Sequence, residues 1–299
     1  MPTRLVVSPH PIDLAATLFP LGRGRSDPTT RIQHGEVVRA MRTPDGPATI
    51  RLLAESSVTV AAEAWGLGAG WALEQAPGMV GAEDDASGFE PQDRLVADLW
   101  RRFSAVRITR ARPVIQSLVP TILEQKVTGV EARRAYARLT RARAEPAPGT
   151  AGLLLPPDPA WVAELPYFEM HPFGVERRRA EVVRAACAKA AWIEGAATLP
   201  LADAKVRLGA LAGIGPWTVA EVARLALGDA DAVSVGDYHL PHAVTWAFAR
   251  EPRGTDERML ELLEPYRGQR GRVQRLIESA HIAAPRFGPK ADIAAIDRL

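Results

Sequence analysis

Leu211-Ala-Gly-Ile-Gly-Pro-Trp-Thr218 joins two segments, residues 201–211 and 218–227, whose apolar residues recur at helical spacing. Gly228 follows the second segment, where a glycine commonly ends a helix. Two helices joined by Gly213-Ile-Gly215 form a compact hairpin, because glycines accept a positive φ. Backbone N–H groups exposed before a helix can bind one phosphate. The hairpin therefore predicts contact with a nucleic-acid backbone without sequence reading, although an ordinary turn between helices fits the same residues.

An acidic residue follows the hairpin at a defined distance. Asp237 lies 22 residues after Gly215, within Ser234-Val-Gly-Asp-Tyr-His239. One interpretation is structural, because an aspartate can cap the helix that is expected to begin near His239. The other is chemical, because one ionised carboxylate can stabilise positive charge that develops on a sugar and can orient or deprotonate a water. The hairpin upstream favours the chemical interpretation.

Taken together, Leu-x-Gly-Ile-Gly-x-Trp-Thr and Val235-Gly-Asp-Tyr-His239 resemble the helix-hairpin-helix DNA glycosylases. Within that superfamily they are most similar to the bacterial 3-methyladenine DNA glycosylase II type. Residues 117–128 are similar to the family's helix and turn before its DNA-inserting residue, and residues 173–180 to a Gly-x-x-x-x-Arg/Lys-Ala element. The resemblance extends over about residues 94–282. It implies a mainly α fold, made of helix-hairpin-helix glycosylase domains with a small N-terminal α/β domain built on an antiparallel sheet.

The resemblance also implies roles for individual residues. Asp237 falls on the catalytic aspartate, and Trp217 on a pocket aromatic that stacks on the flipped base, although core packing is the alternative for a tryptophan. Tyr266 stands where the family has a second pocket aromatic. Glu221 replaces a pocket tyrosine, and it either faces the same cavity as Trp217 or is an exposed helix residue. The residues expected to contact DNA are Gly213, Ile214, Gly215, Thr218, Gln125 and Lys126.

Two departures concern the chemistry. Lys126 occupies the position of the family's apolar wedge, so the gap left by the flipped base is filled weakly there or from elsewhere. Relatives that also cut the strand use a lysine amine at the place of Trp217, and this chain has none there. The sequence thus predicts a monofunctional enzyme that uses water. His239 and His242 lack further convincing ligands, so we expect no metal and no cofactor.

Composition sets the remaining limits. The chain has 299 residues, 47% of them hydrophobic, which suits a globular protein with two or three subdomains. Cys187 is the only cysteine, so no intrachain disulfide, zinc cage or iron–sulfur cluster is expected. The net charge of +2 hides an asymmetry, because the acidic excess lies in residues 1–90. Two arginine clusters, within residues 101–112 and 267–275, are candidates to neutralise phosphates, or else are solvated helix faces.

The predicted organisation begins with a mixed α/β domain over residues 1–86. It has strands near 5–7, 36–42, 48–54 and 58–62, and helices near 13–19 and 65–75. Residues 81–88 are polar and glycine-bounded, as in a linker. Residues 87–299 are expected to be helical, with a hairpin-bearing subdomain at about 108–229 and a second made of 87–107 plus 230–299. The other helices are expected near 91–103, 113–124, 129–143, 175–193, 256–266 and 272–283.

The functional prediction is a monofunctional DNA glycosylase that flips and excises alkylated purines of the 3-methyladenine type in base-excision repair. Two alternatives remain: a glycosylase for another damaged base, deaminated or oxidised, and a non-catalytic helix-hairpin-helix DNA-binding protein. The expected partner is double-stranded DNA that contains damaged bases. We expect no membrane segment, a monomer, and a bacterial cytoplasmic protein that meets the nucleoid through DNA.

Overall fold

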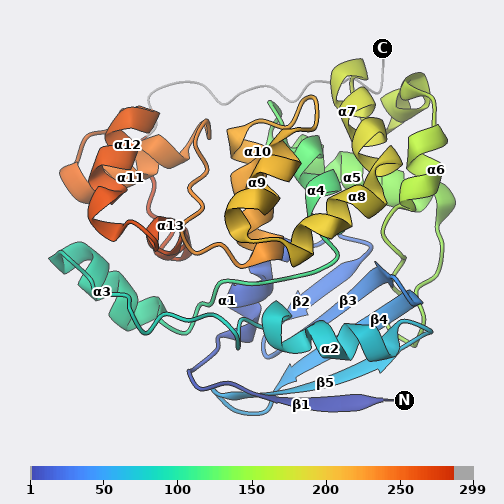
Figure 1. Cartoon of the computed structure of the whole chain (residues 1–299), viewed down its shortest axis with the longest axis horizontal. Helices are drawn as coiled ribbons and strands as arrows, with labels where there is room; N and C mark the ends of the chain where they lie inside the picture. Colours follow the sequence, from blue (N-terminus) through green and yellow to red (C-terminus); the bar gives the residue numbers. More distant parts are fainter. Residues whose placement is uncertain (1, 286–299) are drawn as a thin grey trace.

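The fold is mainly α with a small sheet at one end, as predicted (Figure 1). The computed structural model describes residues 2–285. The sheet lies below the helices α4 to α10 (residues 115–222), and α11 to α13 (residues 240–279) form a second group beside them. After the sheet the chain first forms α3 (Arg94–Phe103), which belongs to this second group, and then returns to α4. None of the helices in the described range is long and apolar enough to cross a membrane. The sheet therefore lies under the first helical group, with the second group to one side (Figure 1).

Five antiparallel strands form the N-terminal sheet within the described residues, in the order β1-β5-β4-β3-β2. Their bounds are β1 Thr3–Val7, β2 Thr30–Gln33, β3 Glu36–Thr43, β4 Gly46–Ala54 and β5 Thr59–Trp65. Buried apolar residues such as Ile50, Leu52 and Val60 pack under α2 (Ala69–Met79), and α1 (Leu14–Leu18) with η1 (Phe19–Leu21) closes the same core.

Two details of this domain differ from the prediction. Strand β2 was missed, because Thr30–Gln33 has four residues and is too short to show an alternating pattern. The helix expected from Trp65 begins at Ala69 instead, because Trp65 still pairs with Thr49 across the sheet and Gly66, at φ +97°, ends the strand. Trp65 thus belongs to strand β5 and not to the helix.

The first helical group carries the hairpin. Its elements are α4 Ile115–Leu123, α5 Gly129–Arg143, α6 Pro159–Glu164, η2 Tyr167–Phe173, α7 Arg177–Ala188, α8 Ala190–Glu194, η3 Gly195–Thr198, α9 Leu201–Gly209, α10 Pro216–Val222 and η4, a π-helical turn, Ala223–Leu227. Helix α4 is buried along its whole length and forms the centre of this group. The bounds of α5 match the prediction, because Thr128 and Glu131 form a capping box that fixes its start.

The single helix predicted over residues 175–193 is wrong. The chain leaves the helix at Lys189, which separates α7 from α8. The break lets α8 point Glu194 at the start of α4. There the Glu194 carboxylate accepts hydrogen bonds from the amides of Val114 at 2.9 Å and Ile115 at 2.8 Å. Helical periodicity continues across the break, so the sequence pattern alone does not reveal it.

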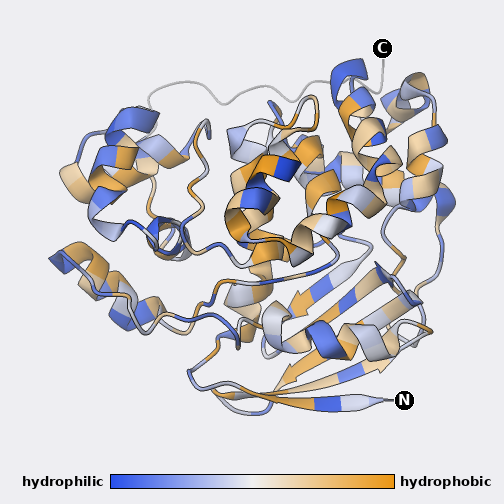
Figure 2. Ribbon diagram, in the orientation of Figure 1, coloured by the Kyte–Doolittle hydropathy of each residue, from blue (hydrophilic) through white to orange (hydrophobic). Residues whose placement is uncertain are grey.

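The second helical group consists of α3 with α11 Leu240–Ala249, α12 Asp256–Leu263, η5 Glu264–Tyr266 and α13 Arg270–Ser279. Figure 2 shows α3 with both hydrophobic and hydrophilic residues, and its buried side chains are Val96 and Leu99. They pack with residues of α11 to α13 in a core separate from that of the first group. The predicted domain boundaries at residues 86, 107 and 229 remain a prediction.

Candidate active site

The hairpin turn uses its two glycines differently. Gly213 has φ +85°, and a Cβ there would lie 2.3 Å from Cγ2 of Val182 on α7. Gly215 has φ −94° with open space around its Cα, and it caps α10. Only Gly213 therefore needs to be glycine for the fold. Gly215 instead leaves the N-terminus of α10 uncovered, where a phosphate could approach.

Two other residues predicted to contact DNA are turned inward. Ile214 is 6% exposed, and its amide donates to the carbonyl of Leu211 at 3.0 Å. Thr218 is 2% exposed, and its hydroxyl accepts a hydrogen bond from Gln125 at 2.9 Å. Both side chains are packed inside the first helical group, so a contact of these two residues with DNA stays a prediction that would involve their backbone. They shape the hairpin from within.

Gln125 and Lys126 stand in the turn between α4 and α5. The Gln125 amide also donates to the carbonyl of Gly213 at 3.0 Å, so it joins this turn to the hairpin. Lys126 is exposed and has a left-handed backbone, with φ +56°. A non-glycine residue is uncommon in this region of backbone conformation, and such residues are found mostly in turns and at functional sites. The turn thus presents Lys126 beside the hairpin.

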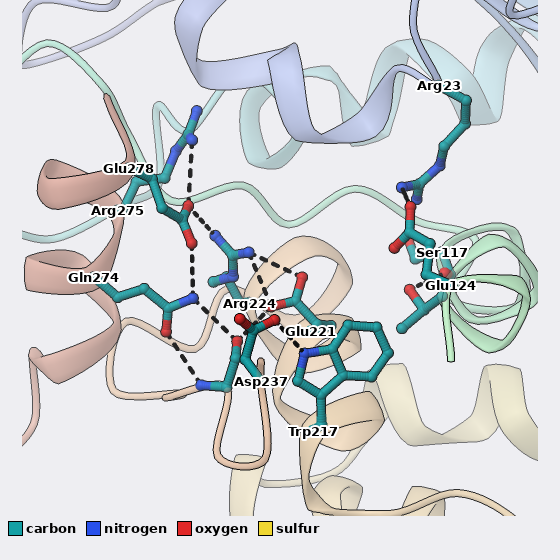
Figure 3. A network of polar contacts seen from close by, with 12 residues as sticks. Arg23, Ser117, Glu124, Trp217, Glu221, Arg224, Asp237, Gln274, Arg275 and Glu278 are labelled. Carbon is teal, nitrogen blue, oxygen red and sulfur yellow. Dashed lines mark hydrogen bonds and ion pairs between the residues drawn. The ribbon is translucent and has the colours of Figure 1, made fainter. Parts of the chain in front are cut away.

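Asp237 is held by both of its carboxylate oxygens. Oδ1 accepts from the amides of His239 at 2.7 Å and Leu240 at 2.8 Å, which caps α11. Oδ2 accepts from the indole Nε1 of Trp217 at 3.1 Å. Figure 3 shows this contact between the loop before α11 and the helix that follows the hairpin. The capping interpretation is therefore correct, and it leaves Oδ2 directed toward Trp217.

Glu221 fits neither of its two predicted descriptions. Its side chain is 13% exposed and receives two hydrogen bonds from Arg224, at 3.0 and 2.9 Å, and one from the Ser234 hydroxyl. Burial raises the pKa of Glu221, while the Arg224 charge opposes the shift. A carboxylate whose charge is already neutralised inside the protein is not a free attractor for a cationic base, and it is not an exposed helix residue either.

Tyr266 does not line a pocket, and this prediction is wrong. It is 4% exposed, with its ring packed near Phe89 and Phe248. Its hydroxyl donates to the Asp93 carboxylate and accepts from the amide of Gln92 at 3.1 Å. Both the ring and the hydroxyl are thus occupied in the core of the second helical group, with no face left for a base.

Sequence reasoning missed Tyr238. It directly follows Asp237 and is 80% exposed, and its ring makes edge contacts with His239 and His242. Solvent exposure of a large aromatic beside the candidate carboxylate is the signal, but the sequence does not reveal exposure. His242 accepts a hydrogen bond from the amide of Gly254 at Nδ1. Among the described residues no group of three or more histidine, cysteine, aspartate or glutamate side chains could hold a metal ion.

Several arginines proposed to neutralise phosphates are used inside the protein. Arg107, Arg272 and Arg275 are buried, and Arg272 forms a bidentate pair with Asp84 at 2.6 and 2.8 Å. Arg270 pairs with Asp231 at 2.6 Å. Arginines close in sequence therefore do not form one basic surface here. Among the cluster members before α4, Arg101, Arg102 and Arg110 remain exposed.

Comparison with known proteins places the fold. No protein-family model matches the sequence, and no curated protein matches it significantly. The chain is similar to a solved 3-methyladenine DNA glycosylase from Archaeoglobus fulgidus, with TM-score 0.78, 17% identity, and coverage of 93% of this chain and 98% of that one. It is also similar to an 8-oxoguanine glycosylase/lyase from Clostridium acetobutylicum, with TM-score 0.71, 10% identity, and coverage of 93% and 96%.

A third solved structure covers a smaller share of this chain. It is a 3-methyladenine DNA glycosylase from Schizosaccharomyces pombe in complex with abasic DNA, with TM-score 0.53 and 17% identity. It covers 66% of this chain and 96% of that one. The chain therefore has the fold of helix-hairpin-helix DNA glycosylases, including the N-terminal sheet domain in the two longer matches.

Proposed function

We propose that this protein is a monofunctional DNA glycosylase that flips a damaged base out of duplex DNA and hydrolyses its N-glycosidic bond. The observation that carries the proposal is the double fixation of Asp237, whose Oδ1 caps α11 while Oδ2 meets the indole of Trp217. A carboxylate fixed in this way beside a helix-hairpin-helix element can stabilise the positive charge that develops on the sugar as the base leaves. The fold of the solved DNA glycosylases supports the same conclusion.

The reaction needs little beyond this carboxylate. As the bond from C1′ to the base nitrogen breaks, its electron pair leaves with the base and C1′ becomes electron-poor. The negative charge of Asp237 stabilises that centre, and the same carboxylate orients or deprotonates the water that forms the new C1′–O bond. A purine alkylated on a ring nitrogen is already cationic and departs as a neutral base, so no strong acid is required.

We propose alkylated purines of the 3-methyladenine type as the substrate class. Trp217 is half-buried with its indole beside Asp237, and an electron-rich indole attracts a cationic base through its π face. The other damaged-base classes are distinguished by an assay of methylated, deaminated and oxidised duplexes. The proposed setting is base-excision repair in a bacterial cytoplasm, by a monomer acting on nucleoid DNA.

Water, rather than a lysine, is the proposed nucleophile. A strand-cutting enzyme of this kind needs an amine next to the sugar to form a Schiff base. Trp217 occupies the place at which the resemblance puts that lysine. Lys205 pairs with Asp229 at 2.7 Å, and Lys126 lies in the turn proposed to meet the DNA gap. Lys290 lies outside the described residues.

Non-specific DNA contact is proposed for the hairpin and the neighbouring turn. Gly213 and Gly215 are exposed at the hairpin, and the Gln125 bond to the Gly213 carbonyl sets Lys126 beside them. Such an arrangement addresses phosphates and the helix gap rather than base edges, so binding should not depend on sequence. The flipped nucleotide would then lie between the hairpin and Asp237.

Substitution of Asp237 tests the catalytic role. We expect Asp237→Asn to fold, because asparagine still caps a helix. It should bind DNA as well as or better than wild type, because a negative charge that faces the DNA is removed. It should excise about a hundred- to a thousandfold more slowly, since a lost transition-state charge costs about 3–4 kcal/mol. The measurement is single-turnover release of base from methylated duplex DNA.

The capping role is separated from the catalytic role by Asp237→Ala, which removes both. We expect it to match Asp237→Asn in excision but to melt at a lower temperature, because a lost cap costs about 1 kcal/mol. Excision by Asp237→Asn within threefold of wild type would reject the catalytic assignment. The non-catalytic alternative holds if wild type releases no base from any tested duplex yet binds DNA.

A further inference from the structure

We infer that Glu221, Ser234 and Gln274 form a positioning network for the loop that carries Asp237, and that Glu221 is therefore a positioning residue rather than a base-recognition residue. The inference rests on the proposed function, in which Asp237 is the catalytic carboxylate. Its core is a set of buried contacts that run from α10 through Ser234 to α13. Figure 3 labels Glu221 and Gln274, the two residues at the ends of this set. None of these three residues needs to touch DNA to affect the reaction.

Ser234 is the centre of the network. It is 1% exposed, and its amide donates to Oε1 of Gln274 at 3.1 Å. Its hydroxyl accepts from Nε2 of Gln274 at 3.0 Å and donates to the Glu221 carboxylate. Its carbonyl accepts from the amide of Asp237 at 3.1 Å. Every polar group of Ser234 is thus engaged, and the last contact holds the backbone of Asp237 directly.

The groups that grip Ser234 are themselves fixed. Arg224 holds Glu221 from η4 and also pairs with Glu278 of α13 at 2.9 Å. Gln274 donates to Glu278 at 2.8 Å as well, which fixes the orientation of its amide toward Ser234. Both terminal nitrogens of Arg224 are paired in this network, and only its Nε has no partner among the described residues. A movement of Glu221 or Gln274 would break buried hydrogen bonds that water does not replace, so the network resists displacement. The hairpin helix and α13 therefore hold the loop between them.

Helix α10 contacts the loop at both ends. Trp217 meets the carboxylate of Asp237, and Glu221, one helical turn later, meets Ser234. The loop between these points is also tied by the Gly236 amide, which donates to Asp256 at 3.0 Å. A displacement at Ser234 would therefore change where Oδ2 of Asp237 lies relative to Trp217. Even a small displacement of the carboxylate would slow the reaction, because catalytic groups act only within narrow limits of geometry.

The test is Ser234→Ala, which removes one hydroxyl and leaves the Glu221–Arg224 pair intact. Ser117→Ala is the matched control, because Ser117 is also 1% exposed but its hydroxyl has no hydrogen-bond partner among the described residues. We expect single-turnover excision by Ser234→Ala to fall on the order of tenfold to a hundredfold, with duplex affinity within twofold of wild type. Gln274→Met, which removes the opposite grip, should act in the same direction, and Ser117→Ala should match wild type.

A readout independent of activity is the ¹⁵N–¹H indole resonance of Trp217, assigned with Trp217→Phe. We expect Ser234→Ala to shift this resonance and to speed its exchange with water, and Ser117→Ala to leave it in place. Unchanged excision and an unchanged indole resonance in Ser234→Ala would overturn the inference. So would a loss of excision matched by an equal loss of DNA affinity. If wild type excises no base, the proposed function fails, and the indole resonance still decides the positioning role.

Discussion

Gly213 and Gly215 lie two residues apart, yet they differ in what a side chain would meet. We expect Gly213→Ala to destabilise the protein by about 1–3 kcal/mol, because its positive φ is strained for alanine and the new Cβ would overlap Val182. Gly215→Ala should keep the melting temperature, since its surroundings are open. It should instead weaken duplex binding, because the new methyl group would stand where a phosphate approaches the amides at the start of α10. A hydrogen bond to a charged group contributes about 1.5–3 kcal/mol, so the expected loss is about tenfold or more.

Thermal melting and DNA titration of the two variants check this prediction together. The variants carry the same methyl group two residues apart, so each is a control for the other. Equal losses of stability in both, or a loss of DNA binding confined to Gly213→Ala, would contradict the assigned roles.

Cys187 is a second residue whose behaviour follows from burial. It is 4% exposed on α7, and burial raises the pKa of its thiol to about 12. The folded thiol therefore binds its proton more tightly than the unfolded one. The contribution of this thiol to stability is complete below the unfolded pKa and is lost as the pH rises through the folded value.

We expect a disulfide reagent at mildly alkaline pH to label Cys187 in native protein far more slowly than in unfolded protein. Rapid stoichiometric labelling of native protein would show that α7 opens readily.

At the scale of elements, the turn between α4 and α5 is coupled to the hairpin through Gln125. Gln125→Ala removes the bonds to both Gly213 and Thr218, whereas Thr218→Val removes only one. At about 1 kcal/mol for each net hydrogen bond, we expect Gln125→Ala to cost roughly twice as much stability. Gln125→Ala should also weaken duplex binding more than Thr218→Val, because it detaches the turn that carries Lys126 from the hairpin. Urea unfolding and DNA titration measure both effects, and a larger loss in Thr218→Val would be inconsistent with the coupling.

Elements that carry their own local signals were predictable from the sequence. Helix α5 begins at its capping box and α6 at Pro159 after Asp158, and each start is set by residues no more than three positions apart. The break at Lys189 has no such signal, because it serves Glu194, which caps α4 some 80 residues away in the chain. Distant partners of this kind are invisible to periodicity.

The candidate site divides along the same line. The hairpin, Trp217 and Asp237 were found because they form one motif at one spacing, and the structure brings the indole and the carboxylate together. Glu221 and Tyr266 were misread, because their surroundings depend on partners such as Arg224 and Asp93 that the motif does not include. The resemblance therefore predicted where a residue lies in the fold better than it predicted which side chains that residue contacts.

For the whole molecule, the loop expected to be a simple linker is a point of attachment. The Asp84 side chain is 4% exposed and pairs with Arg272 of α13, which is 1% exposed. It also pairs with Arg107 at 3.2 Å and accepts from the amide of Ile108 at 3.1 Å. Arg107 in turn donates its amide to Thr17 of α1. One carboxylate thus links the N-terminal domain, the segment before α4 and the second helical group.

Removal of that carboxylate should affect the whole fold. Asp84→Asn keeps the shape of the side chain but leaves Arg107 and Arg272 buried without a countercharge. Breaking a buried ion pair from one side typically costs about 3–5 kcal/mol, so we expect the free energy of urea unfolding to fall by that amount.

The exposed neighbour provides a matched control, since Asp85→Asn changes the net charge equally and should leave the midpoint unchanged. Equal shifts in both variants would mean that net charge, not the buried attachment, sets stability. A single cooperative transition in Asp84→Asn would show that the sheet and the helical groups still unfold together, whereas two transitions would show that Asp84 couples them.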